Sequence, residues 1–574
     1  MSGGRIARWM ETVRRLRPSQ VGHRLVARMR TSGPAPRGGS LAWAGIAPLP
    51  SDARRPAGFP YDRPDGDGWR FAGRRATATD AGLAWEATPT ALERYHAAYA
   101  ETVATLAADG RLAEARRWLA AVVVDAPTHA YVRARRALAL VEAAAHGLEG
   151  AAAVVAADAA ALARTPEWDV RGNHLVANGA ALVRAGAALR GAGARRWAAL
   201  GNAVLTACAR EQVLADGVHY ERSPVYQGLV LEHLLVALET AAARGVPPPR
   251  GIEEAAVRLA VGLQELVLPD GALVRWRDGA PGLALPLERL VAWAARRAGP
   301  LPAPRTGSRA FPAAGFAIVE AGRDAVTLVA APPCPPDLPA HGHADALAYE
   351  VVLGGVRVVA GAGTAAYGAG PDRDRDRRPG AFAGLLVDGE AAADPYGAFR
   401  VGRRGWARHL ETGTRRGWGW ACAHAGFPRA TGVVVRRCVA RTPRGAVVVL
   451  DEVAGRGAHA LTYAAPLGPD LAARVEAGGA VVTGRGVVCR LVVDGGPVRT
   501  EDGGYAVALG ARVPRPVLAW TRTGPFPARM AHAYVPGAGP ASVSAAVIFG
   551  GEVRVVVRSA AGEEVGYLPA GQRP

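Results

Sequence analysis

Residues 299–304, Gly-Pro-Leu-Pro-Ala-Pro, mark the point at which the character of the chain changes. Proline fixes φ and has no backbone N–H, so this stretch can neither continue a helix nor join the middle of a sheet. We interpret it as the linker between two domains. A chain of 574 residues is too long for one hydrophobic core, which agrees with at least two domains.

The part before the linker carries apolar residues at helical spacing. The segments are 112–124, 131–145, 173–189, 229–243 and 252–268. Short breaks containing Gly, Pro or Asp separate them, which predicts antiparallel helical hairpins.

The part after the linker consists of short runs rich in β-branched residues, separated by turn residues. The runs are 316–320, 325–330, 348–353, 356–360, 433–439, 446–450, 487–493 and 553–557. This pattern predicts an all-β sandwich. The chain is therefore expected to have a helical half followed by a β half.

Composition excludes several classes of protein. Half of the residues are hydrophobic and 21% are charged, which excludes a mostly disordered chain. No run of 18 apolar residues lacks a charge, so no membrane-spanning helix is expected. Arginines interrupt every apolar run near the N-terminus, so we expect no signal peptide and a cytoplasmic location.

The net charge is +19, and every basic residue is arginine. A GC-rich genome would favour arginine codons, whereas a functional interpretation requires an anionic partner: nucleic acid, a membrane surface or an acidic polysaccharide. The planar guanidinium suits carboxylate and sulfate because it can bind both of their oxygens. Composition alone leaves these partners open.

The five cysteines are Cys208, Cys334, Cys422, Cys438 and Cys489. Their number is odd and no Cys-x-x-Cys pair occurs. We therefore expect scattered core thiols, with no disulfide framework and no cysteine metal site.

The first 30 residues form a basic amphipathic helix candidate, with Ile6, Trp9 and Met10 on its apolar side. Such an arm can pack on the helical domain, or it can make peripheral contact with an anionic membrane surface.

Three segments gather polar and aromatic residues. They are Gly-Asn-His-Leu-Val-Ala-Asn at 172–178, Asp-Gly-Val-His-Tyr-Glu-Arg-Ser-Pro-Val-Tyr-Gln at 216–227 and His-Gly-His-Ala-Asp at 341–345. A lone histidine at a helix start is more often structural than catalytic. Two histidines at i and i+2 entering a strand share one face, which suits a common site or a metal.

These segments, in this order, resemble motifs of the heparinase II/III-like polysaccharide lyases, a superfamily that includes alginate and heparin lyases. Further similar stretches lie at 92–99, 363–368, 424–427 and 449–452. Residues 16–25 are similar to the N-terminal arm of members associated with polysaccharide assembly. The resemblance covers nearly the whole chain.

The resemblance implies a multidomain α+β fold: an incomplete (α/α) toroid followed by an antiparallel β-sandwich. The expected boundaries are 1–84 for a basic arm and linker, 85–300 for the toroid and 301–574 for the sandwich. It also implies a lyase that cleaves a uronic-acid-containing acidic polysaccharide by β-elimination, in the cleft between the two domains.

That chemistry requires neutralisation of the uronate carboxylate, a base for the C5 proton and an acid for the departing O4. The resemblance assigns Asn173 to the carboxylate and Tyr226 to the acid, and to the base as well if its pKa is lowered. His174 and His341 would be further acid–base or carboxylate-binding groups. The expected substrate-binding residues are Arg222, Glu221, His343 and Tyr95.

Several relatives hold a metal in the β domain, and the sequence departs from their pattern. His343 remains, but the other ligand positions fall on Ala360 or Gly361 and near Phe382. One histidine cannot hold zinc in a closed site, so we predict no metal and no cofactor. The departure leaves open an inactive, lyase-like protein that binds an acidic glycan.

Nucleic-acid binding is not expected. Arginines are dense only at 373–378, where the run 372–378 alternates in sign and is typical of a solvated loop. No known nucleic-acid-binding motif occurs.

Overall fold

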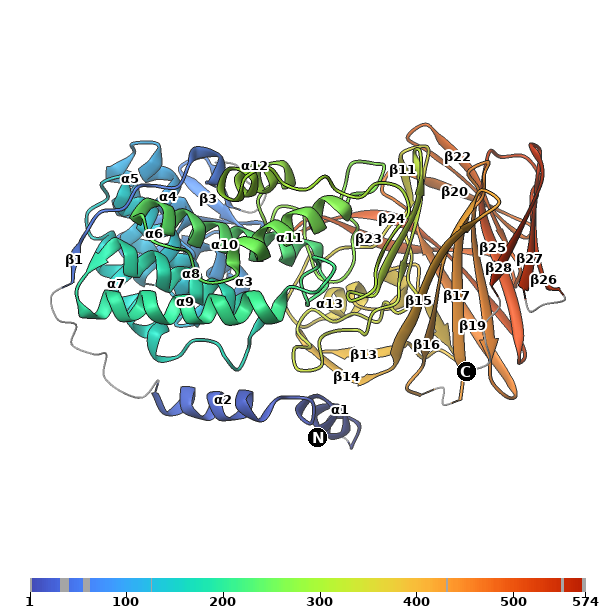
Figure 1. The fold of residues 1–574 in the computed structure, drawn as a ribbon, viewed down its shortest axis with the longest axis horizontal. Helices are drawn as coiled ribbons and strands as arrows, with labels where there is room; N and C mark the ends of the chain where they lie inside the picture. Colours follow the sequence, from blue (N-terminus) through green and yellow to red (C-terminus); the bar gives the residue numbers. More distant parts are fainter. Residues whose placement is uncertain are drawn as a thin grey trace.

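The chain changes from helices to strands at the predicted linker: α12 ends at Ala298 and β7 begins at Arg309. The structure is a computed structural model that describes residues 3–30, 41–54, 62–124, 126–429, 432–548 and 552–569. Figure 1 shows the helical part and the β part side by side.

The helical part is built from antiparallel neighbours joined by short turns, as predicted. α6 packs on α7, α8 on α9, and α10 on both α8 and α11. The helices are α3 (Ala91–Ala98), α4 (Glu101–Ala108), α5 (Leu112–Val124), α6 (Ala130–Ala145), α7 (Ala151–Arg164), α8 (Gly172–Ala188), α9 (Ala192–Gln212), α10 (Pro224–Arg244), α11 (Ile252–Glu265) and α12 (Leu287–Ala298). Their buried faces form two apolar cores, one around Trp118 and one around Trp293.

A small antiparallel sheet precedes these helices, where the sequence predicts only arm and linker. Its strands are β2 (Asp62–Asp65), β3 (Gly68–Phe71), β4 (Arg74–Thr79) and β5 (Gly82–Trp85). Phe71 lies edge-on to Trp118 of α5, with ring centroids 5.9 Å apart. The sheet therefore belongs to the helical domain, because this aromatic contact joins its core.

The β part is antiparallel and has one layer more than a simple sandwich. An eight-stranded sheet, in the order β15-β16-β17-β18-β25-β22-β21-β20, packs one face against the five-stranded sheet β7–β11 and the four-stranded sheet β12-β19-β24-β23. Its other face packs against β26–β28 at the outer end of the molecule (Figure 1). Alternate residues of one strand, Val449 and Leu450 of β18, enter the two different cores.

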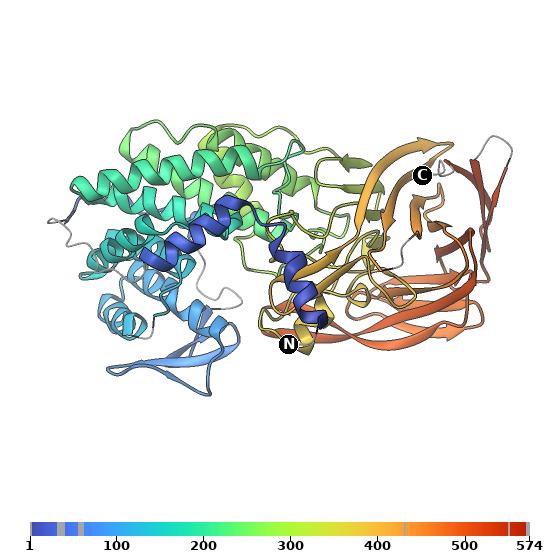
Figure 2. The ribbon, with the colours of Figure 1, turned by 90° about the horizontal axis from the view of Figure 1, so that it is seen from below.

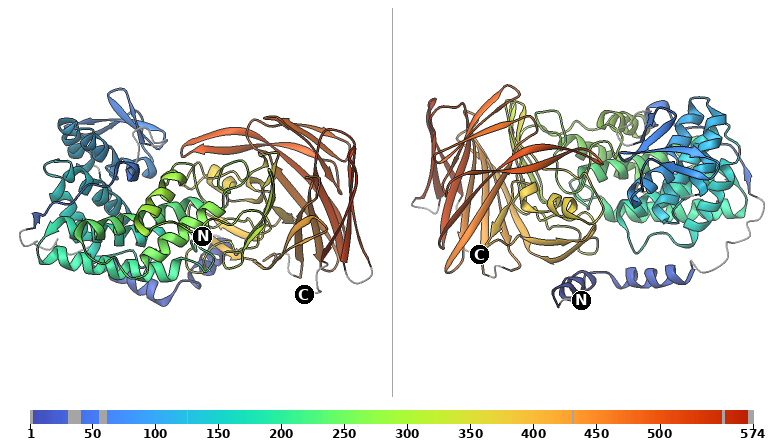
Figure 3. Two further views of the ribbon diagram at one scale, coloured as in Figure 1. Left: turned by 45° about the horizontal axis from the view of Figure 1, so that its top comes forward. Right: turned by 180° about the vertical axis from the view of Figure 1, so that it is seen from behind.

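The strands of the β part have the following bounds: β7 (Arg309–Phe311), β8 (Phe316–Ala321), β9 (Asp324–Val329), β10 (Val351–Leu353), β11 (Val356–Val359), β12 (Leu385–Val387), β13 (Ala393–Tyr396), β14 (Arg400–Arg404), β15 (Trp406–Arg415), β16 (Trp418–Gly426), β17 (Val434–Arg441), β18 (Val447–Ala454), β19 (Ala458–Pro466), β20 (Ala472–Glu476), β21 (Gly479–Gly484), β22 (Val487–Val493), β23 (Arg499–Ala508), β24 (Ala511–Pro525), β25 (Ala528–Pro536), β26 (Ser542–Val547), β27 (Glu552–Ser559) and β28 (Gly562–Pro569). A short helix, α13 (Pro371–Asp376), lies between β11 and β12. Figure 3 shows the layers from two further sides.

The N-terminal arm contacts both domains. It consists of α1 (Gly3–Val13) and α2 (Pro18–Arg30), which cross the outside of the molecule (Figure 2). In α1, Thr12 donates to the carbonyl of Val401 in β14, whereas Gln20 of α2 donates to the carbonyl of Asp169 in the helical domain. Among the described residues, no helix is long and apolar enough to cross a membrane.

The cysteines depart from expectation. Cys422 and Cys438, on the neighbouring strands β16 and β17, form a disulfide, whereas Cys208, Cys334 and Cys489 are free and buried. The prediction of scattered thiols is wrong for this pair, because cross-strand register is not visible in the spacing of cysteines. Disulfides persist mainly in oxidising compartments, so the pair argues against the cytoplasmic location, which stays a prediction.

Candidate active site

One cavity of about 710 Å³ lies where the helical and β parts meet. The four predicted catalytic side chains all line it, although they come from three separate segments: Asn173, His174, Tyr226 and His341. Glu221 and Tyr95, two of the predicted substrate-binding residues, line it as well.

The start of α8 fixes the first two of these residues. Gly172 has φ +57°, and a Cβ there would lie 2.1 Å from Oε1 of Glu221, so only glycine fits. The backbone N–H of Gly172 donates to the Tyr220 hydroxyl at 2.9 Å, and that of Asn173 donates to Oε1 of Glu221 at 2.7 Å. Segments 172–178 and 216–227 therefore interlock, because residues of the second cap the helix that begins in the first.

At three places near the cavity, an arginine with positive φ directly precedes a residue that shapes the site. Arg171, Arg222 and Arg277 have φ of 68°, 60° and 63°, directly before Gly172, Ser223 and Asp278. Non-glycine residues rarely adopt this conformation, and such strain clusters at functional sites.

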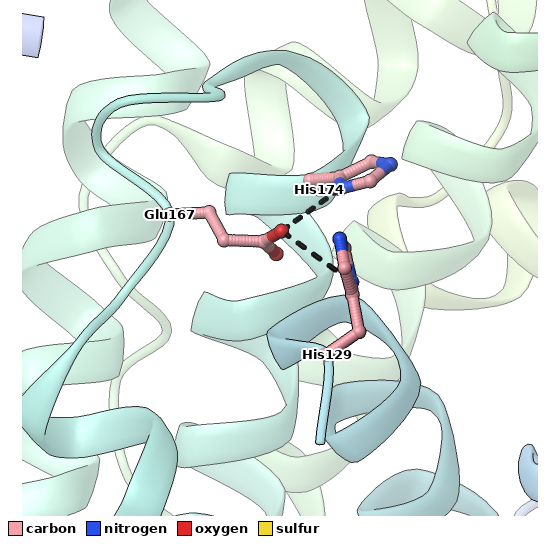
Figure 4. Close-up of side chains that lie close together, drawn as sticks. All are labelled: His129, Glu167 and His174. Carbon is pink, nitrogen blue, oxygen red and sulfur yellow. Dashed lines mark hydrogen bonds and ion pairs between the residues drawn. The ribbon is translucent and has the colours of Figure 1, made fainter. Parts of the chain in front are cut away.

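His174 is held by a buried carboxylate. Its Nδ1 lies 3.0 Å from Oε1 of Glu167, and its ring stacks on Tyr131 with centroids 4.3 Å apart. Burial lowers the pKa of His174, but the Glu167 carboxylate outweighs burial and raises that pKa above its ordinary value. His174 is thus favoured as a cation whose Nε2 is free of Glu167 (Figure 4).

The same carboxylate meets a second histidine, His129, which also lines the cavity (Figure 4). His129, Glu167 and His174 place three metal-ligand atoms within 4.8 Å of one another, the one such group among the described residues. Nδ1 of His129 accepts the backbone N–H of Tyr131, however, and Glu167 binds His174. The group is therefore a hydrogen-bonded pair, His174 and Glu167, with Nδ1 of His129 3.8 Å from the carboxylate.

The amide nitrogen of Asn173 points to Glu221 and not into the open cavity. Its Nδ2 lies 3.2 Å from both oxygens of Glu221, and its Oδ1 has no hydrogen-bond partner within the protein. A buried acceptor without a donor is costly, so Oδ1 is suited to accept a sugar hydroxyl.

The start of α10 positions Tyr226. Ser223 caps the helix and accepts the N–H of Tyr226, and Pro224 occupies the first turn. The Tyr226 hydroxyl donates to the Tyr367 hydroxyl at 2.8 Å, and its ring stacks on His341 with centroids 3.9 Å apart. Burial, and then Tyr367 and Asp278, raise the pKa of Tyr226 well above its usual value. Tyr226 is therefore favoured in its protonated form, and the lowered pKa that a base role would require is not found, whereas its role as the acid stays a prediction.

Asp278 organises the β wall. It lies 2.9 Å from Nδ1 of His341 and 2.7 Å from Nε2 of His343, and it binds both terminal nitrogens of Arg373. Burial raises the pKa of Asp278, but Arg373, followed by the two histidines, outweighs burial and holds that pKa well below its ordinary value. Asp278 is therefore a fixed anion behind the cavity.

The residues around His343 do not fit the metal site that several relatives hold in the β domain. His343 is fully buried, and burial lowers its pKa to about 3. Among the described residues, His343 belongs to no group of three metal-ligating side chains, and Asp278, the carboxylate that it contacts, is already paired with Arg373. Arg373 also corrects the prediction of a solvated loop at 372–378, since Arg373, Asp376 and Arg377 are buried.

Two of the predicted substrate-binding residues lie away from the cavity. Arg222 donates to the carbonyls of Ala314 and Tyr220 instead of facing a substrate. His343 lies behind Asp278, so it can position a neighbour but does not line the cavity. The family resemblance suggested a substrate contact for Arg222, but its guanidinium binds backbone carbonyls instead.

Other residues of the site were not predicted from the sequence. Glu167, His129 and Asp278 gave no signal beyond being single polar residues in short turns. Tyr367 lies in the stretch 363–368, which resembles a family motif, so that stretch could have suggested it.

Comparison with known proteins agrees with this geometry. The model of the heparinase II/III N-terminus matches residues 155–250, and that of the heparinase II/III-like C-terminal region matches residues 303–533. Together they cover more than half of the chain. The chain belongs to the heparinase II/III-like polysaccharide lyases. It is therefore a carbon–oxygen lyase that acts on acidic glycans by β-elimination.

Solved structures of heparinase II/III-like lyases share the fold. A crystal structure of heparinase III matches with a TM-score of 0.70 and 14% identity, covering 96% of this chain and 95% of that one. The heparan sulfate lyase HepC from Pedobacter heparinus matches with a TM-score of 0.60 and 16% identity, covering 97% and 95%. No curated protein matches the chain in sequence. These similarities confirm the predicted toroid followed by a sandwich.

Proposed function

We propose that this lyase cleaves its glycan next to a uronic acid, with Tyr226 as the general acid and His341 as the base. The observation that carries the proposal is the stacked pair itself: a protonated phenol from the helical domain lies on an imidazole from the β domain, both in one cavity. β-Elimination requires one group to take the C5 proton while another gives a proton to O4.

The hydrogen bonds of His341 suit a base. When Nδ1 donates its proton to Asp278, Nε2 carries the lone pair that takes the C5 proton. Glu221 Oε2 lies 3.4 Å from Nε2 and stabilises the imidazolium that forms. The electrons of the C5–H bond form the C4–C5 double bond, the C4–O bond breaks, and the departing O4 takes the proton of Tyr226.

The uronate carboxylate needs a positive partner, because removal of the C5 proton adds negative charge beside it. His174, held as a cation by Glu167, supplies that charge from the opposite wall. Asn173 binds the sugar through its unpaired Oδ1.

Incubation with a panel of uronate polysaccharides tests the proposal, with the ultraviolet absorbance of the new double bond as the readout. Tyr226→Phe should lower the rate about 10²- to 10⁴-fold while glycan binding persists. Tyr567→Phe, on the distant strand β28, is the matched control and should keep full activity. Full activity of Tyr226→Phe would refute the role of Tyr226, and binding of every glycan without product would support an inactive scaffold.

We also propose that the arm contacts an anionic membrane surface. α1 is held to the body by its polar side, with Arg8 binding Asp394 at 2.8 Å. Ile6, Trp9 and Met10 consequently face solvent, with exposed fractions of 43%, 50% and 52%. Basic residues beside an outward apolar face match the chemistry of an anionic lipid surface. Attachment there would agree with the link to polysaccharide assembly suggested by residues 16–25.

Sedimentation with vesicles tests the membrane contact. The protein should bind vesicles with anionic lipid at low salt and not purely zwitterionic ones, and Trp9→Ser with Met10→Ser should abolish binding. Val475→Ser, which removes an exposed apolar side chain of the β part, is the control. Equal binding by both variants would exclude this role for the arm.

A further inference from the structure

The chain carries +19 charges, but the wall of its cavity is not basic. Among the described residues that line the cavity, four are carboxylic acids and two are arginines. The acids are Asp62, Glu93, Glu101 and Glu221; the arginines are Arg135 and Arg171. The excess of positive charge therefore lies elsewhere on the molecule.

Both arginines of the wall already bind carboxylates. Arg135 is buried, forms an ion pair with Glu101, and lies over the ring of Tyr99 at 5.4 Å. Arg171 pairs with Glu211, and its Nε lies 3.3 Å from Asp337. The positive charge of each guanidinium is therefore already partly compensated, which weakens its attraction for an incoming anion.

The arginines just behind the wall are also paired. Arg373 grips Asp278 with both terminal nitrogens, and Arg74 lies 3.1 Å from Glu93. Each of these four described arginines is thus paired with at least one carboxylate before any ligand binds.

Much of the remaining wall is aromatic. Tyr95, Tyr99, Tyr131, Tyr367 and Phe399 line the cavity, and Tyr367 stacks on Phe399 with centroids 6.0 Å apart. Aromatic rings suit the C–H faces of uncharged sugar rings and do not compensate a buried anion.

Carboxylate and sulfate make different demands on such a wall. A uronate carboxylate can be met by His174, whose pKa Glu167 raises, and can also take up a proton as burial raises the pKa of the uronate. A sulfate ester stays ionised at every accessible pH, so it needs a free cation or pays the full cost of burial. When the uronate carboxylate occupies His174, a sulfate beside it meets only arginines that are already paired with carboxylates.

We infer that the glycan bound at this cavity carries its negative charge on carboxylates alone, without sulfate on the sugars that contact the wall. The inference rests on the proposed function, because it assumes that the cavity is the glycan site. It also predicts neutral sugars, or uronates spaced by neutral sugars, beside the uronate that is cleaved.

Matched glycans test the inference: an unsulfated chondroitin hexasaccharide against its 4- and 6-sulfated forms, and heparosan against heparan sulfate of equal length. Binding is measured by calorimetry on Tyr226→Phe, which should not turn the glycans over, and product formation on the unaltered enzyme. At least one unsulfated chain should bind about tenfold more tightly than its sulfated partner. Equal or tighter binding of the sulfated forms, or no binding of any unsulfated chain, overturns the inference.

The two proposals fail in different ways. Selective binding of the unsulfated chain with no unsaturated product from any glycan would refute the lyase mechanism and keep the inference. Unsaturated product formed mainly from sulfated chains would keep the mechanism and refute the inference.

A variant that frees a cation provides a positive test. Glu101→Gln removes one of the two carboxylates that act on Arg135, the other being Glu232, so it should raise the affinity for the sulfated chain several-fold and narrow the difference in affinity between the two chains. Glu114→Gln, which removes one side of the surface pair between Arg111 and Glu114, is the control and should change neither affinity. Unchanged discrimination in a folded Glu101→Gln variant would show that the paired arginine does not set the preference.

Discussion

Each wall of the cavity holds one histidine through a hydrogen bond to a buried carboxylate, but the two carboxylates have different partners. On the helical wall, Nδ1 of His174 meets Glu167; on the β wall, Nδ1 of His341 meets Asp278. The Glu167 carboxylate also accepts a hydrogen bond from a neutral group, Nδ2 of Asn178. Asp278 is bound instead by the guanidinium of Arg373.

Because their partners differ, Glu167 acts on its histidine mainly through its negative charge, whereas Asp278 acts mainly by fixing the orientation of His341. The negative charge of Glu167 acts mainly on its histidines, and it raises the pKa of His174. Much of the charge of Asp278 is compensated by Arg373, so Asp278 fixes the orientation and tautomer of His341 while contributing less negative charge to its ring. One wall therefore presents a histidine whose pKa its carboxylate raises, and the other presents a histidine oriented by a carboxylate that is already paired with an arginine.

Arg373→Met should give the largest effect. It leaves the anion of Asp278 buried without its partner, so the free energy of unfolding should fall by about 3–5 kcal/mol. Chemical denaturation followed by tryptophan fluorescence measures the loss. Arg375→Met, in an exposed pair with Asp372, should change stability by less than about 0.5 kcal/mol. Equal losses would mean that Arg373 does not compensate Asp278.

Asp278→Asn should come next, through catalysis. It removes the anion that fixes the tautomer of His341, so kcat should fall about 10²- to 10⁴-fold in the folded protein. Asp345→Asn is the matched control, because Asp345 is equally buried and pairs with Arg277 at 2.8 Å. If the control lost as much kcat, general destabilisation would explain the result better than the orientation of His341.

Glu167→Gln should change the pH dependence of kcat/KM. Glu167 raises the pKa of His174, so the stabilisation from that pair is fully present at low pH and is lost as pH rises through the raised pKa. The same titration removes the cation that binds the substrate, so kcat/KM should fall on the alkaline side. In Glu167→Gln that fall should begin at lower pH, and an unchanged pH profile would exclude this role of Glu167. Glu149→Gln, on the surface, should leave the profile as it is.

Thr364→Val should have the smallest effect. The Thr364 hydroxyl donates to Oδ1 of Asp278 at 3.1 Å, alongside Arg373 and the two histidines. Its loss should cost about 1 kcal/mol of stability and leave kcat nearly unchanged. A large fall in kcat would show that Asp278 depends on the hydroxyl as much as on the guanidinium.

The sequence was sufficient to predict that the fold divides into a helical part and a β part, and to predict the four residues of the site that line the cavity. The Pro-rich stretch 299–304 and the change of periodicity located the two domains, and Asn173, His174, Tyr226 and His341 meet as expected. Each of these four residues belongs to a short motif that can be recognised directly in the sequence.

The layer behind the cavity could not be predicted in the same way. Asp278 and Glu167 are single acids whose partners come from other segments. Arg373 belongs to a run of alternating charge, which looks solvated until α13 docks and buries it. Local pattern identifies residues that act together within a segment, but the choice of a distant partner depends on the tertiary fold.

The N-terminal arm has a mechanical consequence for the cavity. Arg8 and Thr12 tie it to the β part, and Gln20 and Arg24 tie it to the helical part, so the arm spans the joint between the two walls. Two of these ties are solvent-accessible ion pairs, which salt weakens. Ionic strength therefore acts on two of the contacts by which the arm joins the two domains, without touching the groups that line the cavity.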